Sequence, residues 1–350
     1  MKQRKSNLEL LRIIAMCGIV ALHYTGQELG SAVSNYVFPS FSWFFVQTAN
    51  SLFAPLVNCF VLISGYFLIH KTVFSLKKSA ELFAITIFYG AVSYLIAYAV
   101  NGGQTTVSLV NSLFPFICGK RWFVETYIIL IMIAPFLNLI LNKLSKRNYL
   151  ILLAVQLTFF SLWYSVGLSA PLLDNGYGII NFVTLYMIGG YIRLYGSTTK
   201  LLRRSKWQYA LIYLVSVFAT FCLSYFIYPF GYAFITVIIA SVAAFLFFLK
   251  WDIGTHKAIN FLGASAFDVY FVHGDANTAR LLIFELLGAK YVTDSPWMLL
   301  HLPIVILAMY LLGIVAYYIR IWLFKYTVDP VIRKIPFLCR EIDVAKNNEE

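Results

Sequence analysis

The stretch Leu8–Tyr24, LELLRIIAMCGIVALHY, decides the fold class of this chain. It is apolar over nearly the ~20 residues that a helix needs to cross a bilayer, yet it contains Arg12 and His23. Eleven helical steps of about 100° bring both side chains to nearly the same face, roughly 16 Å apart along the axis. Ionisable residues at membrane depth are costly and usually functional, so this helix predicts a site inside the membrane.

The rest of the chain repeats this apolar character. Of its 350 residues, 61% are hydrophobic and only 12% are charged, whereas soluble domains carry about 25% charged residues. We therefore expect an all-α polytopic membrane protein with about ten transmembrane helices embedded in a lipid bilayer. The apolar segments run over residues 8–25, 46–69, 79–100, 122–141, 149–167, 176–194, 207–226, 232–249, 262–287 and 298–324.

The distribution of cations predicts the orientation of these segments. If the amino terminus is cytoplasmic, 22 of the 27 Lys and Arg residues lie on the cytoplasmic side, and only Lys120, Arg121 and Lys290 lie outside. This asymmetry alternates at every loop, as the positive-inside rule requires. It predicts that both termini are cytoplasmic, with a membrane domain over residues 1–325 and a short cytoplasmic tail over 326–350. The same placement argues against nucleic acid as the reason for the formal charge of +12.

Two interpretations apply to each ionisable residue of the first helix. An imidazole ordinarily titrates near neutrality, so His23 suits proton abstraction from a hydroxyl; alternatively, it forms a hydrogen bond between helices. Arg12 either binds an anionic ligand at the inner end of the site, or pairs with Glu9 three residues earlier and reaches to the interface.

Three further groups of residues are candidates for a site. Lys71, Lys77 and Lys78 follow the second segment, and they either attract a phosphorylated cytoplasmic ligand or only orient the helices. At the outer start of the fourth segment, Trp122 offers a face for stacking on a sugar ring. Beside it, Arg121 breaks the charge rule, and Glu125 would orient His23 if the two were close; an aromatic-belt Trp with an Arg–Glu pair is the alternative.

The ninth segment carries a polar stripe. His273, Asn277 and Arg280 follow steps of four and three residues, which would place them on one helix face with Asp268 and Tyr270 in the preceding turns. Such a stripe either pairs with a neighbouring helix or forms a second wall of the site. The five cysteines form no Cys-x-x-Cys or Cys/His cluster, so neither a metal site nor a disulfide framework is expected. No Walker-type loop or dinucleotide fingerprint appears either, and no bound cofactor is expected.

Taken in order, four motifs resemble the integral-membrane acyltransferase family 3, the O-acetyltransferases of bacterial surface polysaccharides and related glycans. Arg12 and His23 match its Arg/Lys–ten residues–His signature, and Ser64, Gly65 and Tyr66 match its Ser-Gly-Phe/Tyr element. The stretch around Trp122, RWFVETYIILIMIAPFLN, resembles its Trp-containing segment. Ser265, Tyr270 and His273 match its Ser…Tyr-x-x-His element. The family often has arginines after the second span, where this chain has lysines.

The resemblance implies an activity and a donor. A cytoplasmic acyl-CoA, usually acetyl-CoA, would act as co-substrate, with its phosphates near Arg12 and the lysines of the second loop. His23, oriented by Glu125, would deprotonate a hydroxyl of a surface polysaccharide or its lipid-linked precursor, or would carry the acetyl group transiently. The acceptor side of the site would include Arg121, Trp122, Ser64, Tyr270, His273 and Arg280. The location implied is the bacterial plasma membrane.

Two alternatives remain open at this point. The intramembrane charges could belong to a transporter or flippase for a lipid-linked glycan, although such a path would need polar residues spread over several spans. The residues also allow transfer of another acyl group, such as succinyl, and they leave the oligomeric state open.

Overall fold

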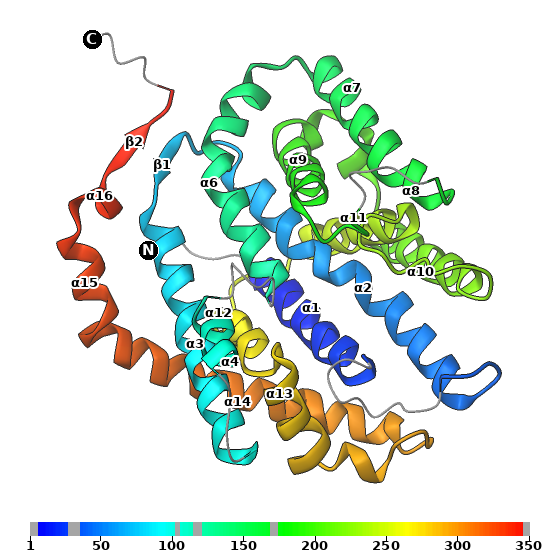
Figure 1. The fold of residues 1–350 in the computed structure, drawn as a ribbon. Helices are drawn as coiled ribbons and strands as arrows, with labels where there is room; N and C mark the ends of the chain where they lie inside the picture. The colour runs from blue at the N-terminus through cyan, green and yellow to red at the C-terminus, as the bar shows by residue number, and fades with distance from the viewer. Residues whose placement is uncertain (1–5, 27–35, 102–105, 115–120, 169–173, 346–350) are drawn as a thin grey trace.

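The computed structural model describes residues 6–26, 36–101, 106–114, 121–168 and 174–345. These residues form a bundle of helices (Figure 1), so the all-α polytopic fold is confirmed. The long helices are α1 (Ser6–Thr25), α2 (Phe41–Leu68), α3 (Lys77–Asn101), α6 (Trp122–Lys143), α7 (Lys146–Leu157), α9 (Ile179–Tyr195), α10 (Lys206–Leu223), α11 (Ile235–Lys250), α12 (Lys257–His273) and α14 (Met298–Tyr326).

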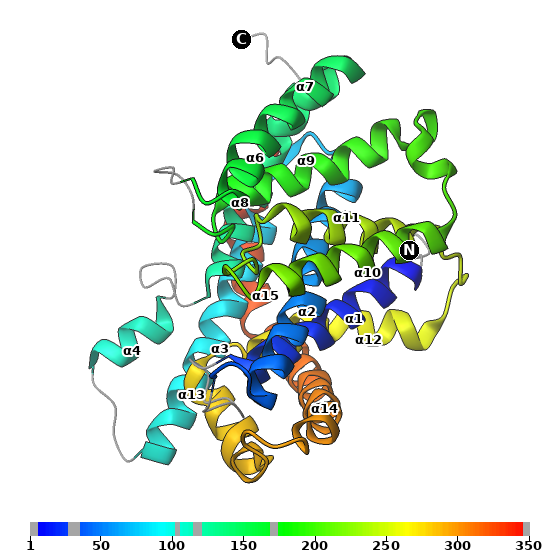
Figure 2. The same cartoon turned by 90° about the vertical axis from the view of Figure 1, so that its right-hand side faces the viewer.

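Short elements connect and extend these helices. A π-helical turn, η2 (Thr158–Leu162), joins α7 to α8 (Trp163–Ser165), and α4 (Thr106–Leu113) projects from the bundle in Figure 2. The remaining elements are β1 (Val73–Ser75), η3 (Gly196–Thr198), η4 (Lys200–Arg203), α13 (Ala276–Ala279), η5 (Arg280–Leu286), η6 (Ala289–Tyr291), α15 (Val328–Lys334), α16 (Pro336–Cys339) and β2 (Glu341–Asp343).

Seven helices of the described ranges are long and apolar enough to cross a membrane, namely α1, α2, α3, α6, the α7–α8 rod, α10 and α14. The other three predicted segments correspond to α9, α11 and α12, with 17, 16 and 17 residues. At about 1.5 Å per residue these helices span roughly 25 Å, slightly less than a hydrocarbon core of about 30 Å. The chain is therefore a multi-pass membrane protein, while the count of ten spans stays a prediction.

Helix α1 lies in the middle of the bundle, against α2, α11, α12 and α14 (Figure 1). Its side chains are buried on several faces, with Leu11, Val20 and Tyr24 showing no exposed surface. A helix that is apolar nearly all round is typical of such a central position. The polar side chains of α1 are therefore surrounded by other helices rather than by lipid.

Contacts between helix ends agree with the predicted alternation of sides. At the amino-terminal end of α1, Ser6 donates a hydrogen bond to Asn260 of α12 at 2.9 Å. At the other end, Tyr24 bonds to Nδ1 of His301 in α14 at 2.9 Å. The first pair joins two ends predicted to be cytoplasmic, and the second joins two ends predicted to be external.

The tail folds back onto the loop that follows α2. Strand β2 pairs antiparallel with β1, with Val73 opposite Asp343 and Ser75 opposite Glu341. Helix α16 also packs on α3. This pairing, which we call the tail clasp, places the carboxyl-terminal tail on the same side as the lysine-bearing loop, as the charge distribution predicts.

The ninth predicted segment is not one helix. Helix α12 ends at His273, where the N–H of Gly274 closes the last turn on the carbonyl of Tyr270. The chain restarts as α13 and the π-helix η5. Glycine and aspartate disfavour helix, and Gly274 and Asp275 interrupt this one. The prediction that His273, Asn277 and Arg280 share one helix face is therefore wrong.

Arg320 is one of the 22 cations that the charge distribution assigns to the cytoplasmic side, yet it lies within α14 and its side chain points inward. Its guanidinium makes a two-pronged ion pair with Asp268 of α12, with Nη2 at 2.9 Å from Oδ2. Tyr89 of α3 donates to the same carboxylate at 2.8 Å. The Asp268 side chain is only 3% exposed, so this polar group fixes α3, α12 and α14 together from inside.

Candidate active site

His23 opens onto a small cavity that is partly open to the outside. Side chains from α1, α2, α6, α12 and the segment before α11 form its wall. They are Met16, Ile19, Leu22, His23, Val57, Phe60, Trp122, Phe123, Tyr232, Phe267 and Tyr270. The wall is largely apolar and aromatic with a few polar groups, as is usual for small-molecule sites. The structure thus brings together three of the predicted site residues, His23, Trp122 and Tyr270.

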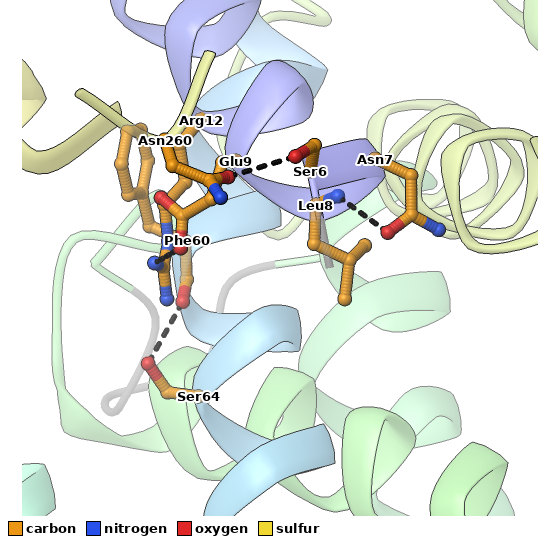
Figure 3. A network of polar contacts seen from close by, with 8 residues as sticks. All are labelled: Ser6, Asn7, Leu8, Glu9, Arg12, Phe60, Ser64 and Asn260. Carbon is orange, nitrogen blue, oxygen red and sulfur yellow. Dashed lines mark hydrogen bonds and ion pairs between the residues drawn. The ribbon is translucent and has the colours of Figure 1, made fainter. Parts of the chain in front are cut away.

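The face of α1 that lines this cavity also includes Arg12, nearer the amino-terminal end of the helix. Met16, Ile19 and His23 follow Arg12 at steps of four, three and four residues, which is one face of a helix. Arg12 pairs with Glu9 at 2.8 Å (Figure 3). Its side chain keeps 31% of its surface exposed. The predicted Glu9 pairing is therefore present, and it leaves part of the guanidinium accessible.

The position of Glu9 depends on close packing with α12. A methyl group added at Gly263 would lie 2.5 Å from Oε2 of Glu9, so the carboxylate lies in the space that a side chain would occupy. Beside it, Ser6 bonds to Asn260 (Figure 3). These contacts set the position of the Glu9–Arg12 pair relative to α12.

His23 has a second histidine beside it. The ring centroids of His23 and His273 lie 4.9 Å apart with planes tilted by 57°, and Tyr270 lies at 6.4 Å from His23. His273 is fully buried. The end of α12 thus meets the outer half of α1 at the cavity, as expected if the ninth segment forms a second wall of the site. The contact between the two imidazole rings themselves was not predicted.

Trp122 belongs to the cavity wall rather than to a lipid-facing belt. Its ring stacks on Tyr232 with centroids 5.2 Å apart, and Tyr177 meets it edge-on at 4.5 Å. Asn58 of α2 donates to the Tyr232 carbonyl at 2.9 Å and so holds this segment in place. Tyr232 was not among the predicted site residues, because it is the first residue of the predicted segment 232–249 and lies just before α11 in the structure.

The predicted contact between Glu125 and His23 is absent. Oε1 of Glu125 accepts a hydrogen bond from the backbone N–H of Arg121 at 2.9 Å, because Arg121 directly precedes the first turn of α6. Nδ1 of His23 is buried and has no hydrogen-bond partner among the described residues. Glu125 therefore stabilises the start of α6 and does not orient the imidazole.

Arg121 is buried, with 3% of its surface exposed. Its guanidinium lies over the ring of Phe271 at 4.9 Å and reaches Ser93 at 3.5 Å. Cation–π contacts of this kind stabilise a desolvated guanidinium. Arg121 thus packs behind the cavity against α12, and its outer neighbour Lys120 lies outside the described residues.

Ser64 and Arg280 do not line the cavity. The Ser64 hydroxyl bonds to the Phe60 carbonyl and to the Tyr127 hydroxyl, each at 2.9 Å, and so joins α2 to α6. Arg280 is exposed at the start of η5 because the chain changes direction after α12. Their predicted place in the site wall is not supported by this geometry.

The three lysines lie on the surface beside the tail clasp. Lys71, Lys77 and Lys78 are all exposed. Partial desolvation, and then the ammonium group of Lys78, lower the pKa of Lys71 from its ordinary value. Leu76 and Ser79, which flank the lysine pair, also line an apolar groove between α3, α6 and α16. This electropositive surface is suited to a phosphorylated ligand.

In the described part of the chain, no group of three or more His, Cys, Asp or Glu side chains is placed to hold a metal ion. A family model described as Acyltransferase domain (Acyl_transf_3) matches residues 5–319. The chain belongs to this family of membrane acyltransferases. The match covers every helix from α1 to most of α14, including the whole cavity wall. No curated protein and no solved structure matches this acyltransferase.

Proposed function

We propose that this acyltransferase moves an acetyl group from cytoplasmic acetyl-CoA to a hydroxyl of a cell-surface polysaccharide or its lipid-linked precursor, in the plasma membrane of a bacterium. The observation that carries the proposal is the place of His23. It lies on the wall of a largely aromatic and apolar cavity, on the same helix face as a partly exposed Arg12.

The geometry supports a route for the donor. A CoA phosphate binds at Arg12, with Lys71, Lys77 and Lys78 drawing the anionic donor to this side of the membrane. The pantetheine arm then follows the stripe of Met16 and Ile19 towards His23. A spacing of roughly 16 Å along the helix suits an extended arm of this kind.

The chemistry at the outer end needs a base. His23 takes the proton of the acceptor hydroxyl while the acceptor oxygen attacks the thioester carbonyl. The carbon–sulfur bond breaks, and the thiolate leaves with the proton that His23 carries. Trp122 offers an aromatic surface to the sugar ring, and Tyr270 lines the same wall. A transient acetyl-His23 is the second route that this placement allows.

The direct test compares the surface glycan of cells with and without the gene, using proton NMR and mass spectrometry. We expect polysaccharide in normal amounts that has lost its O-acetyl esters. Membranes containing the protein should also transfer radiolabel from acetyl-CoA to the purified de-acetylated glycan. Absent polysaccharide would instead point to export or polymerisation, and an unchanged ester content would contradict the proposal.

Replacing Arg12 by alanine should raise the apparent KM for acetyl-CoA by roughly tenfold or more with a smaller change in kcat, since a charge-assisted bond contributes about 1.5–3 kcal/mol. Initial rates at varied donor concentration measure this. Glu9→Gln is the matched control, because it breaks the same ion pair while leaving the cation in place. If both variants raised the apparent KM for acetyl-CoA equally, Arg12 would act only through its ion pair with Glu9, and its role in binding the donor phosphate would be wrong.

A further inference from the structure

Two buried nitrogen atoms without partners face the boundary between α1 and α12. Nδ1 of His23 and Nε2 of His273 both lack a hydrogen-bond partner in the part of the chain that the structure describes, although their rings are only 4.9 Å apart. Burying an imidazole nitrogen without a partner costs free energy. Two such atoms on adjacent rings indicate a contact that forms in another state of the site.

The tautomer of His273 follows from its neighbour on α12. Its Nδ1 lies 2.5 Å from the carbonyl oxygen of Val269. A carbonyl oxygen only accepts hydrogen bonds, so Nδ1 of His273 carries the proton and Nε2 presents a lone pair. His273 is thus a fixed hydrogen-bond acceptor beside His23.

We propose that His273 is a positioning residue that accepts a hydrogen bond from Nδ1–H of His23. This inference rests on the proposed function of His23 as the base. The contact would hold the His23 tautomer in which Nε2 has its lone pair directed to the cavity, ready for the acceptor hydroxyl. Catalytic histidines commonly need a third group in this role, and Glu125 does not fill it.

The contact tightens when His23 becomes charged. Taking the acceptor proton at Nε2 turns His23 into an imidazolium, whose Nδ1–H is a stronger donor. Catalytic hydrogen bonds are often long in the empty enzyme and shorten when the reacting groups assemble. The proton then passes from Nε2 to the departing thiolate, so His273 neither gains nor loses a proton.

The end of α12 is rigid enough to serve this purpose. His273 is the last residue of the helix, where the carbonyl end of the helix dipole favours a nearby positive charge. One turn earlier, Asp268 is held by Arg320 and Tyr89. Phe271 stacks on Tyr89 with ring planes 8° from parallel. These contacts fix the acceptor while the ring of His23 adjusts.

The test compares three replacements of His273 in the full-length enzyme. The amide oxygen of glutamine stands near the position of Nε2, whereas that of asparagine stands near Nδ1. We expect kcat to fall by on the order of 10- to 100-fold in His273→Ala and His273→Asn, with KM changed less than about twofold. His273→Gln should recover much of kcat.

A second histidine provides the structural control. His301 also bridges helices, since it accepts from Tyr24 and donates to the Leu287 carbonyl, and it lies outside the cavity wall. His301→Ala should lower thermal stability while leaving kcat of the folded enzyme unchanged. If His273→Gln and His273→Asn had equal kcat values, and if kcat among the variants fell only in proportion to their melting temperatures, His273 would be a packing residue only.

The two proposals fail in different ways. If His23→Ala is inactive while His273→Ala is as active as the wild type, only the positioning role is wrong. If His23→Ala itself remains active, the proposed function of His23 is wrong. In a His23→Ala background, adding His273→Ala should cause no further loss, because residues acting as a unit are not additive.

Discussion

Replacing His23 by alanine should lower kcat/KM for acyl transfer by on the order of 1,000-fold, the middle of the range for general-base catalysis. The acceptor hydroxyl then has no group in the cavity wall that can take its proton near neutral pH, because the other lining side chains are apolar or phenolic. Radiolabel transfer from acetyl-CoA, measured in membranes with matched protein levels, gives the number.

His301→Ala is the matched control for this variant. It removes from α14 an imidazole of similar burial, which bonds to Tyr24, the neighbour of His23 on α1. The change therefore affects hydrogen bonds between α1 and α14 rather than the cavity wall. The two proteins should insert equally well and differ in turnover. Full activity of His23→Ala would exclude this residue as base and as nucleophile alike.

Replacing Arg320 by methionine should lower the free energy of unfolding by about 3–5 kcal/mol, the cost of leaving a buried charge without its partner. The carboxylate of Asp268 would remain in the interior with only the Tyr89 hydroxyl as a donor. Equilibrium unfolding in detergent, together with the melting temperature, measures the loss.

Two further variants separate this cost from general damage. Tyr89→Phe removes one hydrogen bond and keeps the ion pair, so we expect a loss of about 1 kcal/mol. Combining Asp268→Leu with Arg320→Met replaces both charges by apolar groups, which should restore most of the stability of the single Arg320 variant. A double variant as unstable as the single one would contradict this account of the pair.

The sequence predicted the helical segments well because each is a long apolar run bounded by charged loops. It also predicted the Arg12–His23 stripe, since one helix fixes the relative direction of its own side chains. The break at Gly274 was missed because apolar residues continue on both sides of it. Hydropathy over a window does not detect a two-residue turn.

Most side-chain contacts between different helices could not be predicted from the sequence. Asp268 meets Arg320, and His23 meets His273, only because α1, α12 and α14 pack together. Counting Arg320 as a topology signal hid its role, since a cation near a span end satisfies the charge rule wherever its side chain points. The expected contact of Glu125 with His23 failed because the Glu125 carboxylate turns back to the N–H of Arg121 at the start of α6.

The two strands of the tail clasp are synthesised at very different times. Strand β1 leaves the ribosome long before β2, its only partner among the described strands. Membrane insertion of the first helices is thus finished long before the lysine-bearing loop acquires its closing strand. Nascent chains stalled before residue 341 should therefore expose this loop to protease on the ribosome, whereas chains in which β2 has emerged should protect it.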